Sequence, residues 1–150
     1  EYDVLSERAE TIAADFEAVS TSIKQMEHRM EQIAALKTHI INYAKTRDTY
    51  VAYRKTKAAD KPAFHTAHEA DLLLHEAAKR AFDAQGVKKL PTVKVLQTEY
   101  ADLLTKKKAA YEDYKRLRKE NQELQAVKSN VDTLLRIEEE HQEKKQEQNR

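Results

Sequence analysis

The scarcity of glycine constrains this chain more than any other feature of its sequence. Gly86 is the single glycine in 150 residues, and the chain has only two prolines and no cysteine. Tight hairpin turns and phosphate-binding loops use glycine because its backbone adopts positive φ without strain. Sheet folds, dinucleotide-binding folds and P-loops are therefore effectively excluded. A composition rich in Ala, Lys, Glu, Leu and Gln is instead typical of long helices and coiled coils.

Apolar residues recur at heptad spacing in two segments, which predicts two long helices. The first is expected from about residue 3 to about residue 55, and the second from about residue 92 to about residue 145. The heptad series of the first helix is Leu5, Ile12, Val19, Met26, Ile33 and Ile40. The heptad series of the second helix is Leu96, Leu103, Ala110, Leu117, Leu124 and Val131. A helix of this length with one apolar stripe needs a partner that covers the stripe.

A shorter helix is expected between the long ones, from about residue 61 to about residue 85. Asp60 stands at a position that suits an N-cap, and Pro62 falls in the first turn. Gly86 follows the last turn, where a helix C-cap favours glycine. Residues 86–91 then form a linker, so the expected order is long helix, short helix, long helix.

The chain is accordingly expected to be all-α, a single helical coiled-coil domain over residues 1–150. In it the two long helices form an antiparallel hairpin, joined by the shorter helix at one end. If the end of the first long helix meets the start of the second, facing positions sum to about 147, to within about a heptad. Phe16 then lies near Val131. An intermolecular coiled coil, with the middle helix as a spacer, is the alternative that the sequence leaves open.

Several classes of protein find no support in the sequence. Uninterrupted apolar runs are only a few residues long, whereas a bilayer needs roughly 20, so we expect no membrane insertion. The absence of cysteine fits a reducing cytoplasm and excludes a disulfide framework. Because the chain starts with Glu1 and residues 141–150 are all polar, we expect it to be a fragment of a larger protein.

Charge is strongly segregated along the chain although the net charge is only +1. Residues 1–36 carry a net charge of −5, residues 37–61 of +5, residues 62–86 of −2, residues 87–119 of +6 and residues 120–150 of −3. In the expected hairpin the two basic segments lie at the same end. That end would gather about +11 and the other about −8, so that folding would produce a dipolar molecule.

Six of the seven tyrosines fall within the basic segments. Clustered Lys and Arg side chains supply the sequence-independent attraction for phosphates, and exposed aromatic rings stack on unpaired bases. This combination favours contact with DNA or RNA. The other interpretation is that the tyrosines are core residues and the cations a solvated face. The candidate nucleic-acid-binding residues are Arg47, Tyr50, Tyr53, Arg54, Lys55, Lys57, Lys88, Lys89, Lys94, Lys106, Lys107 and Lys108.

The sequence offers no strong sign of catalysis or of a metal site. His65, His68 and His75 share the expected middle helix, but the HExxH spacing of a zinc helix is missing. His65 and His68 with a nearby carboxylate could hold a metal only weakly, and a solvated or capping role is favoured. Ser-His-Asp spacing and a nucleophile elbow are also missing. We therefore expect no catalytic residues, no metal and no cofactor, and do not expect this fragment to be an enzyme.

Three stretches of the chain carry a resemblance to a known family. They are NYAKTRDTYVAYRK (42–55), HEAAKRAFDAQGVKKLPTVKVLQTEYADLL (75–104) and LQAVKSNVDTLL (124–135). They resemble the C-terminal helical region of relaxases, the mobilisation nucleases of conjugative and integrative elements in Gram-positive bacteria. The residues of the basic segments that match the family pattern are Arg47, Tyr50, Tyr53, Arg54, Lys55, Lys88 and Lys89.

In such proteins an N-terminal nuclease domain nicks one DNA strand at the origin of transfer, using a tyrosine nucleophile and a histidine-bound metal ion. The histidine motif and the nuclease sheet are not found in this sequence, so the resemblance implies a non-catalytic accessory role in the bacterial cytoplasm. That role is contact with origin DNA and assembly with auxiliary relaxosome or coupling proteins. The alternative is a coiled-coil module that forms a homodimer or docks to the conjugative secretion machinery without contacting DNA.

Overall fold

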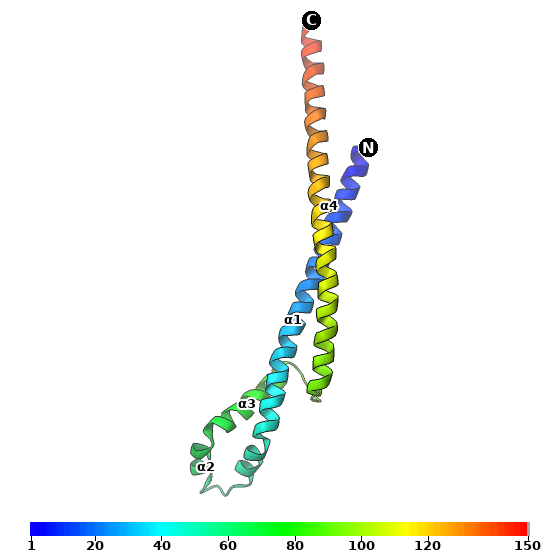
Figure 1. The fold of residues 1–150 in the computed structure, drawn as a ribbon. Coiled ribbons are helices and arrows are strands. Elements are labelled where there is room, and N and C mark those ends of the chain that lie inside the picture. The colour runs from blue at the N-terminus through cyan, green and yellow to red at the C-terminus, as the bar shows by residue number, and fades with distance from the viewer. Residues whose placement is uncertain (150) are drawn as a thin grey trace. The chain divides into compact units, whose positions relative to one another are not determined.

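The computed structural model describes residues 1–149, and all regular secondary structure in that range is helical (Figure 1). The helices are α1 (Tyr2–Lys55), α2 (Lys61–Ala67), α3 (Glu69–Ala84) and α4 (Val93–Gln148). The prediction of an all-α fold is confirmed. Contacts group the chain into two compact units. Unit 1 consists of residues 1–25 and 106–150, and unit 2 of residues 26–105.

The two long helices, α1 and α4, contain neither glycine nor proline, so no residue forces an interruption in either of them. α1 has Asp3 in its first turn and Arg54 and Lys55 in its last. An acidic group near the start and basic groups near the end complement the helix dipole. Thr92 lies just before α4, and its hydroxyl oxygen accepts a hydrogen bond of 3.2 Å from the Val95 N–H, as an N-cap does.

The expected middle helix over residues 61–85 is two helices in the structure. The break is at His68, where φ is −123° and ψ is 27°, outside the helical range. No glycine or proline lies there, which is why the residue pattern did not predict the break. Asp60 stands at the N-cap of α2, as expected, but its side chain makes no capping hydrogen bond. Its backbone oxygen accepts the Phe64 N–H instead.

Gly86 ends α3 in the way that the sequence predicted. Its φ is +68°, in the left-handed region that residues with a Cβ rarely adopt. The Val87 N–H donates to the Phe82 oxygen at 2.9 Å, and the Gly86 N–H donates to the Asp83 oxygen at 3.1 Å. This pair of bonds is a Schellman motif, which satisfies carbonyls at the helix end. Val87 also packs against the apolar cluster that contains Phe82, so the turn fixes the chain direction after α3.

The core of unit 2 joins three helices. Its buried cluster consists of Ile33 and Leu36 of α1, Ala78 and Phe82 of α3, and Leu96 of α4. Each of these side chains has at most 6 % of its surface exposed. α3 therefore packs along the C-terminal half of α1, and the start of α4 packs on α1 in the same cluster (Figure 1).

The core of unit 1 joins the two long helices in a register that differs from the prediction. Its buried cluster consists of Ala9 and Ile12 of α1 with Leu117 and Leu124 of α4. The Phe16 ring lies against the Tyr114 ring, with centroids 4.8 Å apart, and not near Val131. These two positions sum to 130, so the expected sum of about 147 is wrong by 17 positions.

The physical reason for the wrong register lies in unit 2. The prediction assumed that α4 begins opposite the end of α1. In the structure the C-terminal part of α1 packs against α2 and α3 instead, for example through the stacked rings of Tyr50 and His75. Leu96, at the start of α4, packs on Ile33 and Leu36, about 20 residues before the end of α1.

Candidate nucleic-acid interface

The C-terminal end of α1 and the segment that follows it carry a group of exposed cationic side chains, formed by Arg47, Arg54, Lys55 and Lys57. Arg47 and Arg54 are seven residues apart, so they project from the same face of the helix. The free carbonyl groups at a helix C-terminus favour cations there. Within residues 1–149, none of the four side chains takes part in an ion pair. Their charges are therefore available to an anionic partner.

The linker before α4 and the first turn of α4 add three more exposed cations, Lys88, Lys89 and Lys94. All of them belong to unit 2, like the group at the end of α1. Unit 2 thus holds nine of the twelve candidate residues. The remaining three, Lys106, Lys107 and Lys108, belong to unit 1. There the Lys107 ammonium lies 5.9 Å from the centroid of the Tyr111 ring.

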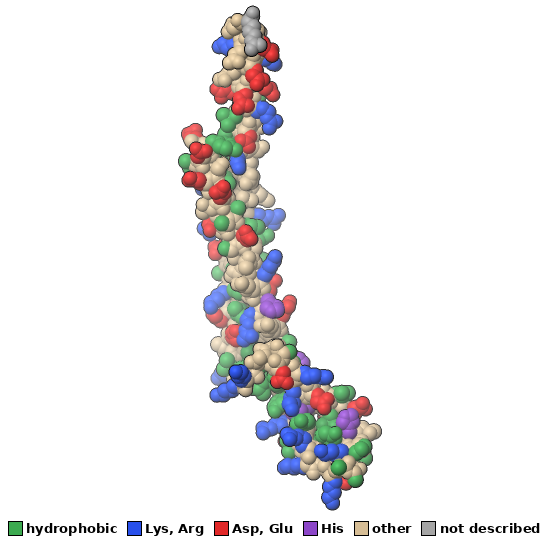
Figure 2. Space-filling model, turned by 180° about the vertical axis from the view of Figure 1, so that it is seen from behind, with side chains coloured by type: hydrophobic (Ala, Val, Ile, Leu, Met, Phe, Trp, Pro, Cys, Tyr) green, Lys and Arg blue, Asp and Glu red, His purple; other side chains and the backbone are tan. Residues whose placement is uncertain are grey.

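Figure 2 shows more Lys and Arg than Asp and Glu side chains on the visible face of the part that holds α2, α3 and the end of α1. By sequence, unit 2 carries 13 basic and 10 acidic residues, a net charge of +3, and unit 1 carries a net charge of −2. The basic segment 87–119 is divided between the two units. The expected concentration of about +11 at one end is therefore wrong, because it depended on the wrong register.

The candidate tyrosines Tyr50 and Tyr53 are half-buried, and their rings make contacts within unit 2. The Tyr50 ring stacks on His75 at 4.2 Å, and the Lys79 ammonium lies 4.9 Å from its centroid. The Tyr53 ring contacts Phe64 at 6.1 Å and His65 at 6.0 Å. These contacts agree with the interpretation that the tyrosines are core residues. In this conformation Tyr50 and Tyr53 do not offer a platform for stacking on bases.

The least expected feature of unit 2 is the environment of His75. Only 1 % of its surface is exposed, and its ring lies against Tyr43 as well as Tyr50. The Thr46 hydroxyl oxygen is 3.0 Å from its Nδ1. Burial lowers the pKa of His75, and the positive charge of Lys79 lowers it further. The sequence did contain a signal for this site, because Tyr43, Thr46 and Tyr50 are spaced to share one helix face.

The other histidines of the middle helices take part in aromatic contacts. His68 lies 4.4 Å from Phe64, ring centroid to ring centroid, and His65 meets Tyr53 edge to face. In the described part of the chain, no group of three or more His, Cys, Asp or Glu side chains is placed to hold a metal ion.

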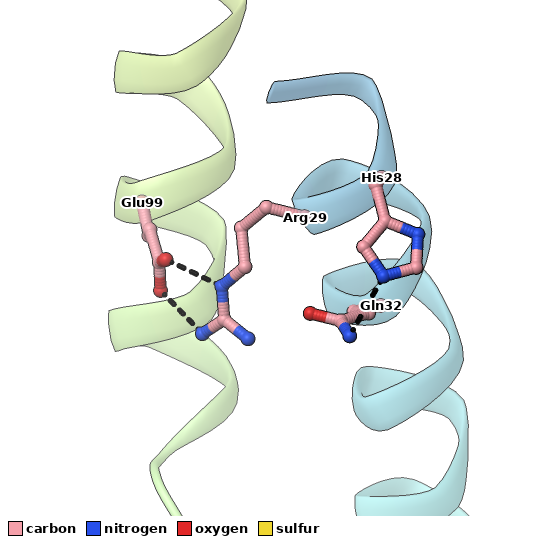
Figure 3. Close-up of polar contacts among 4 residues, drawn as sticks. All are labelled: His28, Arg29, Gln32 and Glu99. Carbon is pink, nitrogen blue, oxygen red and sulfur yellow. Dashed lines mark hydrogen bonds and ion pairs between the residues drawn. The ribbon is translucent and has the colours of Figure 1, made fainter. Parts of the chain in front are cut away.

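A second polar feature of unit 2 is the ion pair between Arg29 of α1 and Glu99 of α4 (Figure 3). The Arg29 Nε and one terminal nitrogen donate to the two carboxylate oxygens at 2.7 and 3.1 Å. This bidentate geometry is the strong form of the arginine–carboxylate pair. The hydrogen bonds from Arg29 lower the pKa of Glu99. The pair adds a polar contact between α1 and α4 within unit 2, near the buried Leu96 contact.

No helix in the described residues is long and apolar enough to cross a membrane. Comparison with known proteins gives no match to a family model, to a curated protein or to a solved structure.

Proposed function

We propose that this chain is a non-catalytic accessory module of a conjugative relaxase, and that it contacts DNA at the origin of transfer through phosphates. The observation that carries the proposal is the group of exposed cations in unit 2, which have no acidic partner within residues 1–149. The contact surface consists of Arg47, Arg54, Lys55, Lys57, Lys88, Lys89 and Lys94. The resemblance of residues 42–55 and 75–104 to relaxases supplies the biological setting.

The proposal differs from the sequence hypothesis in how the tyrosines act. Because Tyr50 and Tyr53 are engaged by His75, Phe64 and His65, base stacking has no part in it. Attraction between phosphates and Lys or Arg side chains is independent of base sequence and falls steeply with salt. The module would thus hold DNA non-specifically, and recognition of the origin sequence would belong to another part of the relaxase. It carries out no nicking itself.

As the scaffold of this module we propose an antiparallel hairpin of α1 and α4. Two pairs of contacts support this arrangement. In unit 1, Tyr2 of α1 interacts with Asp132 of α4, and Phe16 of α1 contacts Tyr114 of α4. A later residue of α1 thus meets an earlier residue of α4, as in an antiparallel pair. In unit 2, Glu99 pairs with Arg29, and the earlier residue Leu96 packs with Ile33.

A binding titration tests the DNA contact. The probes are a fluorescent mixed-sequence 30-mer and its duplex, and the readout is anisotropy at 50 to 300 mM salt. We expect the variant Arg47→Ala/Arg54→Ala/Lys88→Ala/Lys89→Ala to bind at least about tenfold more weakly at low salt. Its log–log salt slope for the duplex should fall by up to about 3.6, since each lost phosphate contact reduces the slope by about 0.9.

The matched control removes four cations from unit 1, in the variant Lys115→Ala/Arg116→Ala/Lys144→Ala/Lys145→Ala. It has the same net charge as the first variant, so it separates a local surface from the charge of the whole chain. Equal losses in the two variants, or no loss in the first, would contradict a contact surface in unit 2. Nicking of the probe in the presence of Mg²⁺ or Mn²⁺ would contradict the non-catalytic role.

One observation favours a second function, a coiled-coil module that binds protein partners and does not contact DNA. The C-terminal part of α4 exposes several large apolar side chains, with exposed fractions between 45 and 66 %. They are Val127, Leu134, Leu135 and Ile137. Sedimentation velocity over a hundredfold range of concentration distinguishes this function. Concentration-dependent association, together with an unchanged probe anisotropy, would favour the protein-binding module, either as a homodimer or as a dock for relaxosome or coupling proteins.

A further inference from the structure

The contact between α1 and α3 in unit 2 is built around a buried ionisable side chain, His75. Tyr43 and Tyr50 stack on it with centroid distances of 4.6 and 4.2 Å and interplanar angles of 22° and 20°. These tyrosines are seven residues apart on α1, which separates their backbones by about 10.5 Å along the helix axis. That separation leaves room for one ring between them, and the imidazole fills it.

Nδ1 of the imidazole is hydrogen-bonded to Thr46, which lies between the two tyrosines on the same face of α1. The Thr46 hydroxyl donates its single proton to the Asn42 oxygen at 2.7 Å. It therefore accepts at its other contact, the 3.0 Å bond to Nδ1 of His75. This arrangement suits a neutral ring that carries its proton on Nδ1.

The surroundings of the His75 ring disfavour the imidazolium, the form that carries a proton on both ring nitrogens. From α1, the ionisable groups against it are the phenols of Tyr43 and Tyr50. Burial is the largest effect that disfavours the imidazolium, and Lys79 of α3 disfavours it further. Glu76 of α3 and the backbone of Tyr43 favour it, but each has a smaller effect than Lys79. Within residues 1–149, no carboxylate forms a hydrogen bond with the ring. A protonated His75 would thus be a buried cation without a hydrogen-bonded carboxylate, which is costly.

We propose that the stacked contact of Tyr43, His75 and Tyr50 is a pH-sensitive switch that holds α3 on α1 and releases it on acidification. In the closed form the ring is neutral and buried. In the open form it is solvated and takes a proton from water. Opening exposes the faces of both tyrosines and separates Phe82 from its partners on α1. This inference rests on the geometry of unit 2 and is independent of DNA binding.

Amide hydrogen exchange measured by mass spectrometry at pH 7.5 and 5.5 tests the switch on the whole chain. After correction for intrinsic exchange rates, the opening equilibrium of α3 peptides should rise by up to about tenfold at pH 5.5. This limit follows from a histidine with a pKa of about 6.5 in the open form and no protonation in the closed form. The interval lies above the ordinary pKa of carboxylates, so their titration contributes little. An unchanged opening equilibrium would overturn the proposal.

Two variants and one titration test whether the pH dependence of α3 exchange comes from His75. His75→Phe keeps the stack and removes the titration, so its α3 peptides should exchange equally at both pH values. His141→Gln removes an exposed histidine of α4 and should behave like the parent chain. Persistent pH dependence in His75→Phe would overturn the switch. If that variant fails to fold, an NMR titration of the parent chain decides, since a pKa of His75 at or above 6.5 overturns the proposal and a lower one supports it.

Discussion

The packing of α4 on unit 2 leads to a quantitative prediction for Leu96. This side chain is 1 % exposed and lies in one buried cluster with Ile33 and Phe82. Replacing a fully buried leucine by alanine costs about 2–5 kcal/mol, depending on how well the surroundings collapse into the cavity. The cluster contains only five buried residues, so partial collapse is easy and a value near the middle of the range is expected. For Leu96→Ala we predict a loss of about 3 kcal/mol in the stability of unit 2.

The matched control is Leu104→Ala, the same substitution two turns later in α4, at a side chain that is 38 % exposed. It should cost less than about 1 kcal/mol, because little apolar surface returns to water. Alanine has a slightly higher helix propensity than leucine, so both variants gain the same few tenths of a kcal/mol at most. The difference between them therefore measures burial and not helix formation.

Urea denaturation followed by far-UV circular dichroism provides the measurement. The midpoint of the transition assigned to unit 2 should fall in Leu96→Ala, with an unchanged dependence on urea. Equal costs for the two variants would refute the reasoning, because Leu96 would then not be the residue that anchors α4 to α1 and α3. A transition that keeps its midpoint in both variants would mean that α4 does not contribute to the folding of unit 2.

Two further predictions concern polar and backbone features of unit 2. A double-mutant cycle of Arg29→Ala and Glu99→Ala should give a coupling of about 0.5–1 kcal/mol that shrinks in high salt, since both side chains are about 40 % exposed. Because the pKa of Glu99 is lowered in the folded chain, this coupling is present above the ordinary glutamate pKa and is lost as the pH falls through the lowered one. Gly86→Ala should cost about 1 kcal/mol in thermal unfolding even though a Cβ would meet no atom within 4 Å, because φ is +68°.

Local features of the fold were accessible from the sequence, and the reasons are physical. The heptad series predicted α1 and α4 because an apolar stripe at helical spacing needs only local geometry. Gly86 predicted the end of α3 because a left-handed cap selects glycine. The break at His68 has no such signal, since it involves neither glycine nor proline. Aromatic contacts such as the one between Tyr53 and Phe64 depend on where α2 lies, which local propensity does not specify.

The candidate site was predictable in its charges but not in its arrangement. Exposure of cations such as Arg47 and Lys88 follows from their residue type, because an unpaired cation is rarely buried. The roles of Tyr50 and Tyr53 did not follow, because a tyrosine at helical spacing suits both a core and a stacking surface. The structure distinguishes these roles by placing α3 against α1, so that His75 occupies the space between two tyrosines.

The charge distribution shows why register is the decisive unknown in a chain of this kind. The net charge of each segment is a property of the sequence, whereas the field that a partner meets depends on which segments pack together. The observed register differs from the expected one by 17 positions. As a result, the cationic run that begins at Lys106 belongs to the unit that contains the acidic residues 1–25, and not to the expected basic end. Heptad stripes tolerate such shifts, because apolar positions recur every three or four residues and a shift of 17 is two heptads plus three residues. Contacts that do not repeat along the helices select one register, and the bond between Arg29 and Glu99 is one of them. The apolar pattern of a single helix does not reveal such contacts.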